Sequence, residues 1–140
     1  MREGMKEYVS ARTGDRYYEL RHASGLRILL YPKNENNSTY AVFGTRYGSV
    51  DTTFRVDGEE LFSVPEGIAH YLEHKLFESE DGDAFSRYAK TGASANAYTS
   101  FDSTCYLFSC SDHFEESLEI LLDFVQKPYF TEETVKKEQG

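Results

Sequence analysis

The chain has 140 residues, 39% of them apolar, and carries 24 acidic against 15 basic side chains for a formal net charge of -9. This length fits one domain, and the apolar share is enough for one core, which argues against intrinsic disorder. A negative surface repels phosphates and anionic lipid, and no apolar run approaches the roughly 20 residues that span a bilayer, so no nucleic acid and no membrane is expected as a partner.

The N-terminal part of the chain carries strand signals. Tyr17–Arg21 and Leu26–Tyr31 are rich in strand-forming residues and flank the turn-forming segment 22–25, which predicts a hairpin. A long strand is expected over Thr39–Tyr47, followed by a turn and a short strand at 54–56. The first residues lack the apolar stretch of a signal peptide, so we expect a cytoplasmic protein.

The first expected helix begins at the segment 65–67, because proline suits a first turn, where its missing N–H has no partner to lose. Ile68, Leu72 and Leu76 recur at i, i+4 and i+8 and predict the apolar stripe of this helix. The acidic segment 78–83 that follows lacks the closing glutamate of a calcium loop, so a solvated connection is expected there.

Two strands and three helices are expected in the rest of the chain. The expected elements are a helix over Ala84–Ala89, strands over Ala93–Ser100 and Thr104–Cys110, a helix from Asp112 to Lys127, and a helix over Glu132–Glu138 capped by Thr131. Asp112 and Glu115 fit a capping box at the start of the longer helix. Its buried face is expected to consist of Phe114, Leu118, Leu121, Leu122 and Val125.

This order of hairpins and helices predicts an α+β fold, with a mainly antiparallel sheet packed against helices. Cys105 and Cys110 are an odd number of residues apart in one expected strand, so they should lie on opposite faces and not pair. The last helix shows no stop signal, so we expect residues 1–140 to form a single N-terminal domain, truncated at its C-terminal end.

The expected first helix also carries a candidate metal site. His70 and His74 are four residues apart and share one helical face, so both imidazoles can reach one ion, and Glu73 points near the same side. Zinc lowers the pKa of a bound water to about 7, and a nearby carboxylate can take the proton and pass it to a leaving amine. The alternative is an exposed face with two surface histidines that pair with Glu73 or Glu66.

Three segments resemble the insulinase/processing-peptidase family, most of all its bacterial processing-protease-like members. Residues 67–77 match the metal helix of the family, whose His-x-x-Glu-His is the inverted zincin signature. Residues 92–100 resemble its Gly-x-x-x-Asn-Ala-x-Thr strand, and residues 121–130 resemble the segment after it. The similarity covers most of the chain, from Gly25 onward, and implies the N-terminal metallopeptidase half-domain of this family.

The resemblance implies a zinc cofactor, with His70 and His74 as metal ligands and Glu73 as the catalytic base. It also implies that the third ligand is a glutamate at about position 145, beyond this chain. Glu138 is then a supporting acidic residue near the site. Because a catalytic zinc needs three protein ligands and a water, we expect the full-length protein to be a zinc metallopeptidase and this chain alone to be inactive.

The strand at 92–100 is a candidate for binding peptide. Ala93, Ala95 and Ala97 alternate with larger residues, and a small-sided open edge can accept a peptide as an added strand. The alternative is that these small residues let a helix pack closely. The resemblance favours binding and implies Asn96 and Ala97 as substrate contacts.

Two functions therefore remain in view. The first is a zinc-dependent endopeptidase domain that hydrolyses peptides or small unfolded proteins, with a homologous second half or partner subunit of the same family. The second is a non-catalytic partner subunit that keeps the peptidase fold. The intact set of His70, Glu73 and His74 favours the first.

Overall fold

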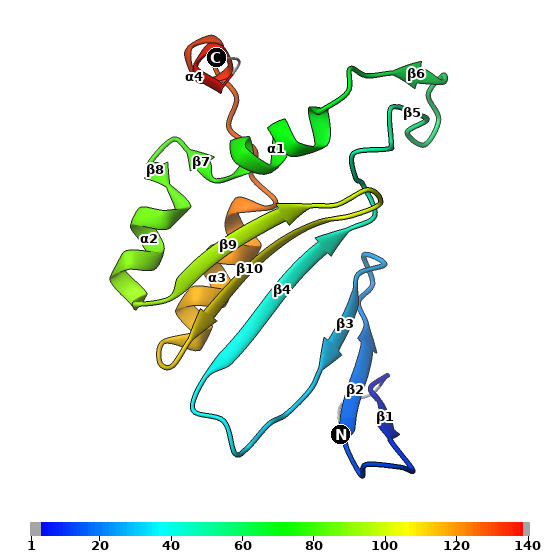
Figure 1. Cartoon of the computed structure of the whole chain (residues 1–140), viewed down its shortest axis with the longest axis vertical. Coiled ribbons are helices and arrows are strands. Elements are labelled where there is room, and N and C mark those ends of the chain that lie inside the picture. The colour runs from blue at the N-terminus through cyan, green and yellow to red at the C-terminus, as the bar shows by residue number, and fades with distance from the viewer. Residues whose placement is uncertain (1–3, 139–140) are drawn as a thin grey trace. The chain divides into compact units, whose positions relative to one another are not determined.

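The computed structural model describes residues 4–138 and divides into two compact units, Met1–Asn37 and Ser38–Gly140 (Figure 1). All the strand pairings between described residues are antiparallel, and helices pack against the largest sheet of the second unit, so the predicted α+β fold is confirmed. No helix within residues 4–138 is long and apolar enough to cross a membrane.

The first unit is a three-stranded sheet in the order β1-β2-β3. Its strands are β1 (Lys6–Val9), β2 (Arg16–Arg21) and β3 (Arg27–Leu30). The predicted hairpin is confirmed, with Arg21 opposite Arg27 across its turn. β1 was not predicted, because its four residues are all exposed and show no alternation of apolar and polar side chains. Tyr8 of β1 stacks on Tyr17 of β2 with ring centroids 4.9 Å apart.

The second unit is built on a sheet in the order β4-β10-β9. The strands are β4 (Thr39–Thr45), β9 (Ser94–Thr99) and β10 (Thr104–Cys110), close to the predicted bounds. α2 (Ala84–Thr91) and α3 (Phe114–Phe124) pack together, and α3 lies across the far side of the sheet in the view of Figure 1. Burial alternates strictly along the central strand β10, so the face of the sheet that carries its buried residues is the core face.

Aromatic rings form much of the core between the sheet and these helices. Tyr88 of α2, Phe108 of β10 and Phe124 of α3 are at most 3% exposed and lie within ring-contact distance of one another or of shared neighbours. Cys110 points into this core while Cys105 lies on the other face, and both are free thiols, as predicted.

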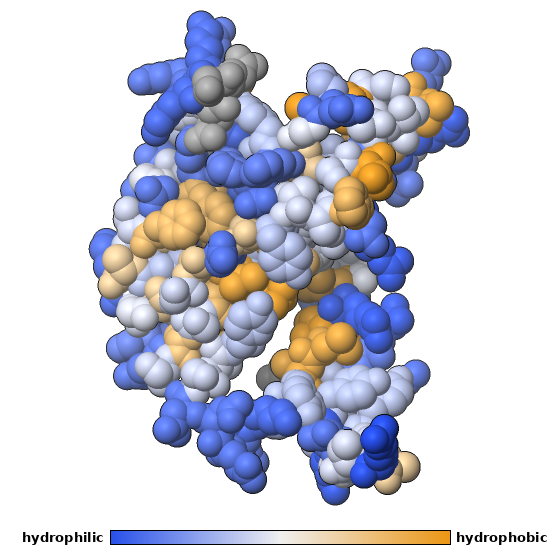
Figure 2. Space-filling model, viewed as in Figure 1, coloured by the Kyte–Doolittle hydropathy of each residue, from blue (hydrophilic) through white to orange (hydrophobic). Residues whose placement is uncertain are grey.

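The opposite face of the sheet is open within the second unit. Figure 2 shows apolar side chains gathered over the middle of the sheet on this side. Leu107 of β10 lies opposite Val42 of β4, which is 46% exposed, and Tyr40 and Tyr98 are exposed on the outer strands.

The start and the buried face of α3 differ from the prediction. Asp112 does not cap the helix in the predicted way; the N-cap is His113, which has a left-handed φ of 54°, and its N–H donates to Asp112 Oδ1 at 2.8 Å. The residues that α3 buries are Ser117, Ile120, Leu121 and Phe124. Of the predicted face, Leu121 is confirmed and Leu118 and Val125 are half-buried against the core, whereas Leu122 is only half-buried and Phe114 is exposed. The apolar pattern missed Ser117, which is buried because its hydroxyl donates to Thr91 Oγ1 at 2.9 Å.

The remaining elements of the second unit surround α1 (Ile68–Leu76). Before it comes the hairpin of β5 (Thr53–Phe54) and β6 (Phe62–Ser63), of which only the first strand was predicted. After it, the predicted acidic loop contains a two-residue hairpin, β7 (Glu78–Ser79) with β8 (Gly82–Asp83). The last helix is α4 (Glu132–Glu138), and Thr131 caps it as predicted, with Oγ1 accepting from Thr134 N at 3.2 Å.

Candidate active site

Helix α1 presents two different faces. Gly67 precedes it with a left-handed φ of 87°, a conformation that favours glycine, and the helix then packs against β9 and β10. Its buried residues are Ala69, Glu73 and Lys75, whereas the predicted stripe of Ile68, Leu72 and Leu76 is only half-buried. The most buried side chains of α1 are therefore not those of the apolar stripe, although Leu76 packs against the core, because Glu73 and Lys75 have partners in Thr99 and Glu78 that no hydropathy pattern reveals.

The other face carries the predicted metal ligands. His70 and His74 are exposed, and their Nε2 atoms lie 2.9 Å apart. Donor atoms of His70, Glu73 and His74 all lie within 4.8 Å of one another. Two histidine nitrogens bound tetrahedrally to zinc at 2.0–2.1 Å stand about 3.3 Å apart, so a small opening of this pair accommodates the ion. The donor set, two imidazoles beside a carboxylate, thus fits zinc.

Glu73 is held at the junction of α1 with the sheet. It is 9% exposed, and its Oε2 accepts a hydrogen bond from Thr99 Oγ1 at 2.5 Å. Burial raises the pKa of the Tyr106 phenol well above its usual range, and the negative charge of Glu73 raises it further. The carboxylate therefore accepts from a hydroxyl of β9, and its charge acts on a buried aromatic residue of β10.

The candidate peptide-binding strand β9 is an edge strand. It pairs with β10 on one side, and no strand between residues 4 and 138 pairs with its other side. The predicted small face is not open, because Ala93, Ala95 and Ala97 pack against the core. Asn96 is exposed, and its Oδ1 accepts from the backbone N–H of Ala97 at 2.8 Å, so the side chain covers a main-chain donor of the strand.

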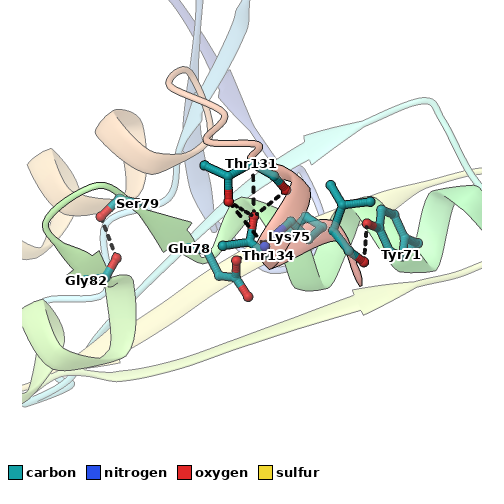
Figure 3. Close-up of polar contacts among 8 residues, drawn as sticks. Tyr71, Lys75, Glu78, Ser79, Gly82, Thr131 and Thr134 are labelled. Atoms are coloured by element: carbon teal, nitrogen blue, oxygen red, sulfur yellow. Dashed lines mark hydrogen bonds and ion pairs between the residues drawn. The ribbon is translucent and has the colours of Figure 1, made fainter. Parts of the chain in front are cut away.

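Glu138 is the last residue of α4, and its side chain lies outside the described part of the chain. α4 itself packs against the metal helix. Tyr71 Oη of α1 donates to the carbonyl oxygen of Val135 at 3.3 Å, beside the Thr131–Thr134 cap (Figure 3).

A buried ion pair lies at the C-terminal end of α1. Lys75 is fully buried, and its Nζ lies 2.5 Å from Glu78 Oε2 of β7 (Figure 3). Sequence reasoning missed this pair and the bond from Thr99 to Glu73. The i,i+3 spacing of Lys75 and Glu78 was a visible signal for the first. For the second, the only signal was that Thr99 belongs to the segment resembling the family strand.

Comparisons with known proteins agree with this geometry. Residues 63–140 match the family Insulinase (Peptidase family M16). A Bacillus subtilis protein named as an uncharacterized zinc protease, YmfH, is 56% identical over 124 residues, which cover 88% of this chain and 29% of that protein. The chain thus spans about 30% of the length of that protein and of a second Bacillus subtilis relative, the putative zinc protease AlbF.

Two solved structures share the fold. An M16-like peptidase from Alicyclobacillus acidocaldarius is 42% identical with a TM-score of 0.83, over 100% of this chain and 30% of that one. A protease from Helicobacter pylori is 25% identical with a TM-score of 0.73, over 89% of this chain and 29% of that one. The family match covers more than half of the chain and includes the whole of α1, so this chain belongs to the insulinase family, peptidase family M16.

Proposed function

We propose that this chain is the N-terminal metallopeptidase domain of a zinc-dependent endopeptidase. The observation that carries the proposal is the convergence of His70, Glu73 and His74 on one helix, with the two Nε2 atoms 2.9 Å apart and all three donor groups within 4.8 Å. Membership of a peptidase family and relatives named as zinc proteases support it. The proposal also includes a glutamate beyond this chain as the third zinc ligand. It includes Glu138 as a supporting acidic residue near the site.

The three side chains divide the work by their charge. His70 and His74 would hold zinc through their Nε2 atoms, and the ion when bound polarises the scissile carbonyl and lowers the pKa of a water to about 7. Glu73 takes the proton of the attacking water on a carboxylate oxygen. It then delivers that proton to the nitrogen of the leaving amine, so that one residue acts first as base and then as acid.

The substrate of this proposal is an extended peptide or a small unfolded protein. Strand β9 has an unpaired edge among the described residues, and a peptide added there gains main-chain hydrogen bonds that do not depend on sequence. Asn96 and Ala97 are the contacts. An incoming carbonyl oxygen would replace Asn96 Oδ1 on the Ala97 N–H, which frees the Asn96 amide to bind the peptide as well.

In this proposal a homologous second half or partner subunit completes the enzyme. The complete enzyme is proposed to be cytoplasmic. A non-catalytic partner subunit is the competing function. The complete set of two imidazoles and a carboxylate disfavours it, since a chain without hydrolytic activity has no need to keep these groups converging.

The test compares Glu73→Gln with Glu66→Gln in the full-length protein. Glu73→Gln keeps the shape of the side chain but removes the base, so kcat/KM for an unstructured peptide should fall by about 10²–10⁴-fold while zinc stays bound. Glu66, an exposed residue just before α1, is the matched control and should have no effect. Undiminished cleavage by Glu73→Gln would sink the peptidase assignment. A wild-type protein that holds no zinc at micromolar metal and cleaves nothing would establish the partner subunit instead.

A further inference from the structure

Thr99 ends strand β9 at the point where the strand meets the metal helix. Its hydroxyl donates to Oε2 of Glu73 at 2.5 Å, and both residues are shielded from solvent: Glu73 is 9% exposed and Thr99 is half-buried. A threonine is well suited to hold such a bond, because branching at Cβ restricts its χ1 torsion. The carboxylate of Glu73 is thereby fixed through one of its two oxygens.

The backbone beside Thr99 is itself clamped. The turn between β9 and β10 is closed by Ser100 N donating to Ser103 O at 2.8 Å. The segment after β4 then binds the same turn, with Ser49 N donating to Ser100 O at 2.9 Å and Val50 N donating to Phe101 O at 3.0 Å. The hydroxyl of Thr99 is therefore presented from a supported strand end rather than from a loose loop.

Gly48 permits that clamp. A Cβ at this position would lie 2.4 Å from Phe101 O and 2.5 Å from Asp102 N, closer than any side chain tolerates. Only glycine lets the two backbones approach so closely. The segment that follows β4 and the tip of the β9–β10 hairpin thus form one rigid support for Thr99.

We infer that Thr99 is a positioning residue for Glu73, an inference that rests on the proposed peptidase function. The terminal torsion of a glutamate is broad and nearly two-fold, so a carboxylate without a partner samples many orientations. Donation from Thr99 to Oε2 restricts that torsion and leaves Oε1 as the oxygen that receives the proton of the attacking water. The role of Thr99 is therefore in the chemical step and not in holding the metal or the peptide.

The test measures full-length Thr99→Val and Thr99→Ser with an unstructured peptide as substrate and zinc as the metal. Valine keeps the branched shape but removes the donor, so kcat should fall by about tenfold or more, the value of one hydrogen bond to a charged group. KM should stay within about twofold, because the peptide contacts are untouched. Serine restores the hydroxyl and should recover most of kcat.

Thr91→Val is the matched control. Thr91 is also half-buried, and its hydroxyl donates to Tyr88 O and accepts from Ser117 Oγ, so its bonds join α2 and α3 and involve none of the α1 residues that carry the candidate site. Thr91→Val should lower the thermal midpoint of the zinc-free protein and leave kcat unchanged. Thr99→Val should leave the zinc affinity, measured by competition with a chelating dye, unchanged.

Three results would overturn the inference: wild-type kcat in Thr99→Val, a loss that Thr99→Ser does not recover, or a loss of kcat matched by an equal loss of zinc affinity. If the valine variant does not fold, Thr99→Ala takes its place in the same comparison. Failure of the proposed function looks different, because Glu73→Gln would then cleave as well as the wild-type protein. A normal Thr99→Val beside an inactive Glu73→Gln overturns only the role of Thr99.

Discussion

Helices α1 and α3 both pack against the same sheet, but they are attached to it by different forces. α3 buries Ile120, Leu121 and Phe124 among aromatic side chains, so its position follows from apolar packing. α1 buries Glu73 and Lys75, and each of these needs a specific partner. The difference indicates that α3 is built for stability. α1 is placed by polar contacts that fix where its histidines and its carboxylate lie.

The largest effect on stability is expected from the buried ion pair of α1. Lys75 is fully buried and the Glu78 side chain is 20% exposed. Glu78→Gln leaves the ammonium group of Lys75 without a counter-charge, which should lower the free energy of unfolding by about 3–5 kcal/mol. Urea denaturation of the full-length protein measures it, and Glu80→Gln, an exposed acid in the same connection, is the matched control.

Lys75→Met sharpens this prediction. It removes the buried charge and fills the same space, and the Glu78 left behind can turn toward solvent, so the loss should be much smaller than for Glu78→Gln. Equal losses in the two variants, or a Glu78→Gln that is as stable as Glu80→Gln, would show that α1 is held by apolar packing like α3.

Leu121→Ala applies the same measurement to α3. Leu121 is 1% exposed, and truncation of a buried leucine to alanine costs about 2–5 kcal/mol, depending on how far the cavity collapses. Leu122→Ala makes the identical change at a half-buried neighbour and should cost less. Folded Leu121→Ala should keep the kcat of the wild-type protein, because α3 contributes no group to the candidate site. A reduced kcat in the folded variant would contradict this separation of roles.

The comparison of the two helices also explains which features could be predicted from the sequence. The bounds of α2, α4, β9 and β10 follow from turn residues, caps and strand-forming runs, which are local signals. The spacing of His70 and His74 is local too, and the predicted convergence of their imidazoles is confirmed. Such features depend on neighbours a few residues away, and helical or strand periodicity fixes them.

Two of the features that were missed depend on contacts between distant segments. An apolar stripe of α1 was predicted from Ile68, Leu72 and Leu76, but Glu73 is buried more deeply than these residues, because Thr99 supplies a hydroxyl 26 residues away. Ser117 is buried in α3 for the same reason, since its partner is Thr91. Hydropathy treats a buried polar residue as surface, so every such pair shifts the predicted face of a helix.

The smallest effect is expected at the exposed ion pairs of α3, which contrast with the buried pair of α1. Hydrogen bonds from Lys127 and then Arg87 hold the pKa of Asp123 below its usual value, so the folded chain binds a proton there less readily than the unfolded chain. The contribution of the Asp123 carboxylate to stability is therefore present at neutral pH and is lost as the pH falls from about 4 through the lowered pKa.

Asp123→Asn should lower the free energy of unfolding by less than about 1 kcal/mol at pH 7, because solvent screens the pair, and the difference from the wild-type protein should vanish at lower pH. Urea denaturation at pH 7 and at acidic pH measures this. A cost that persists unchanged below the lowered pKa would mean that packing of the side chain, rather than its charge, stabilises this end of α3.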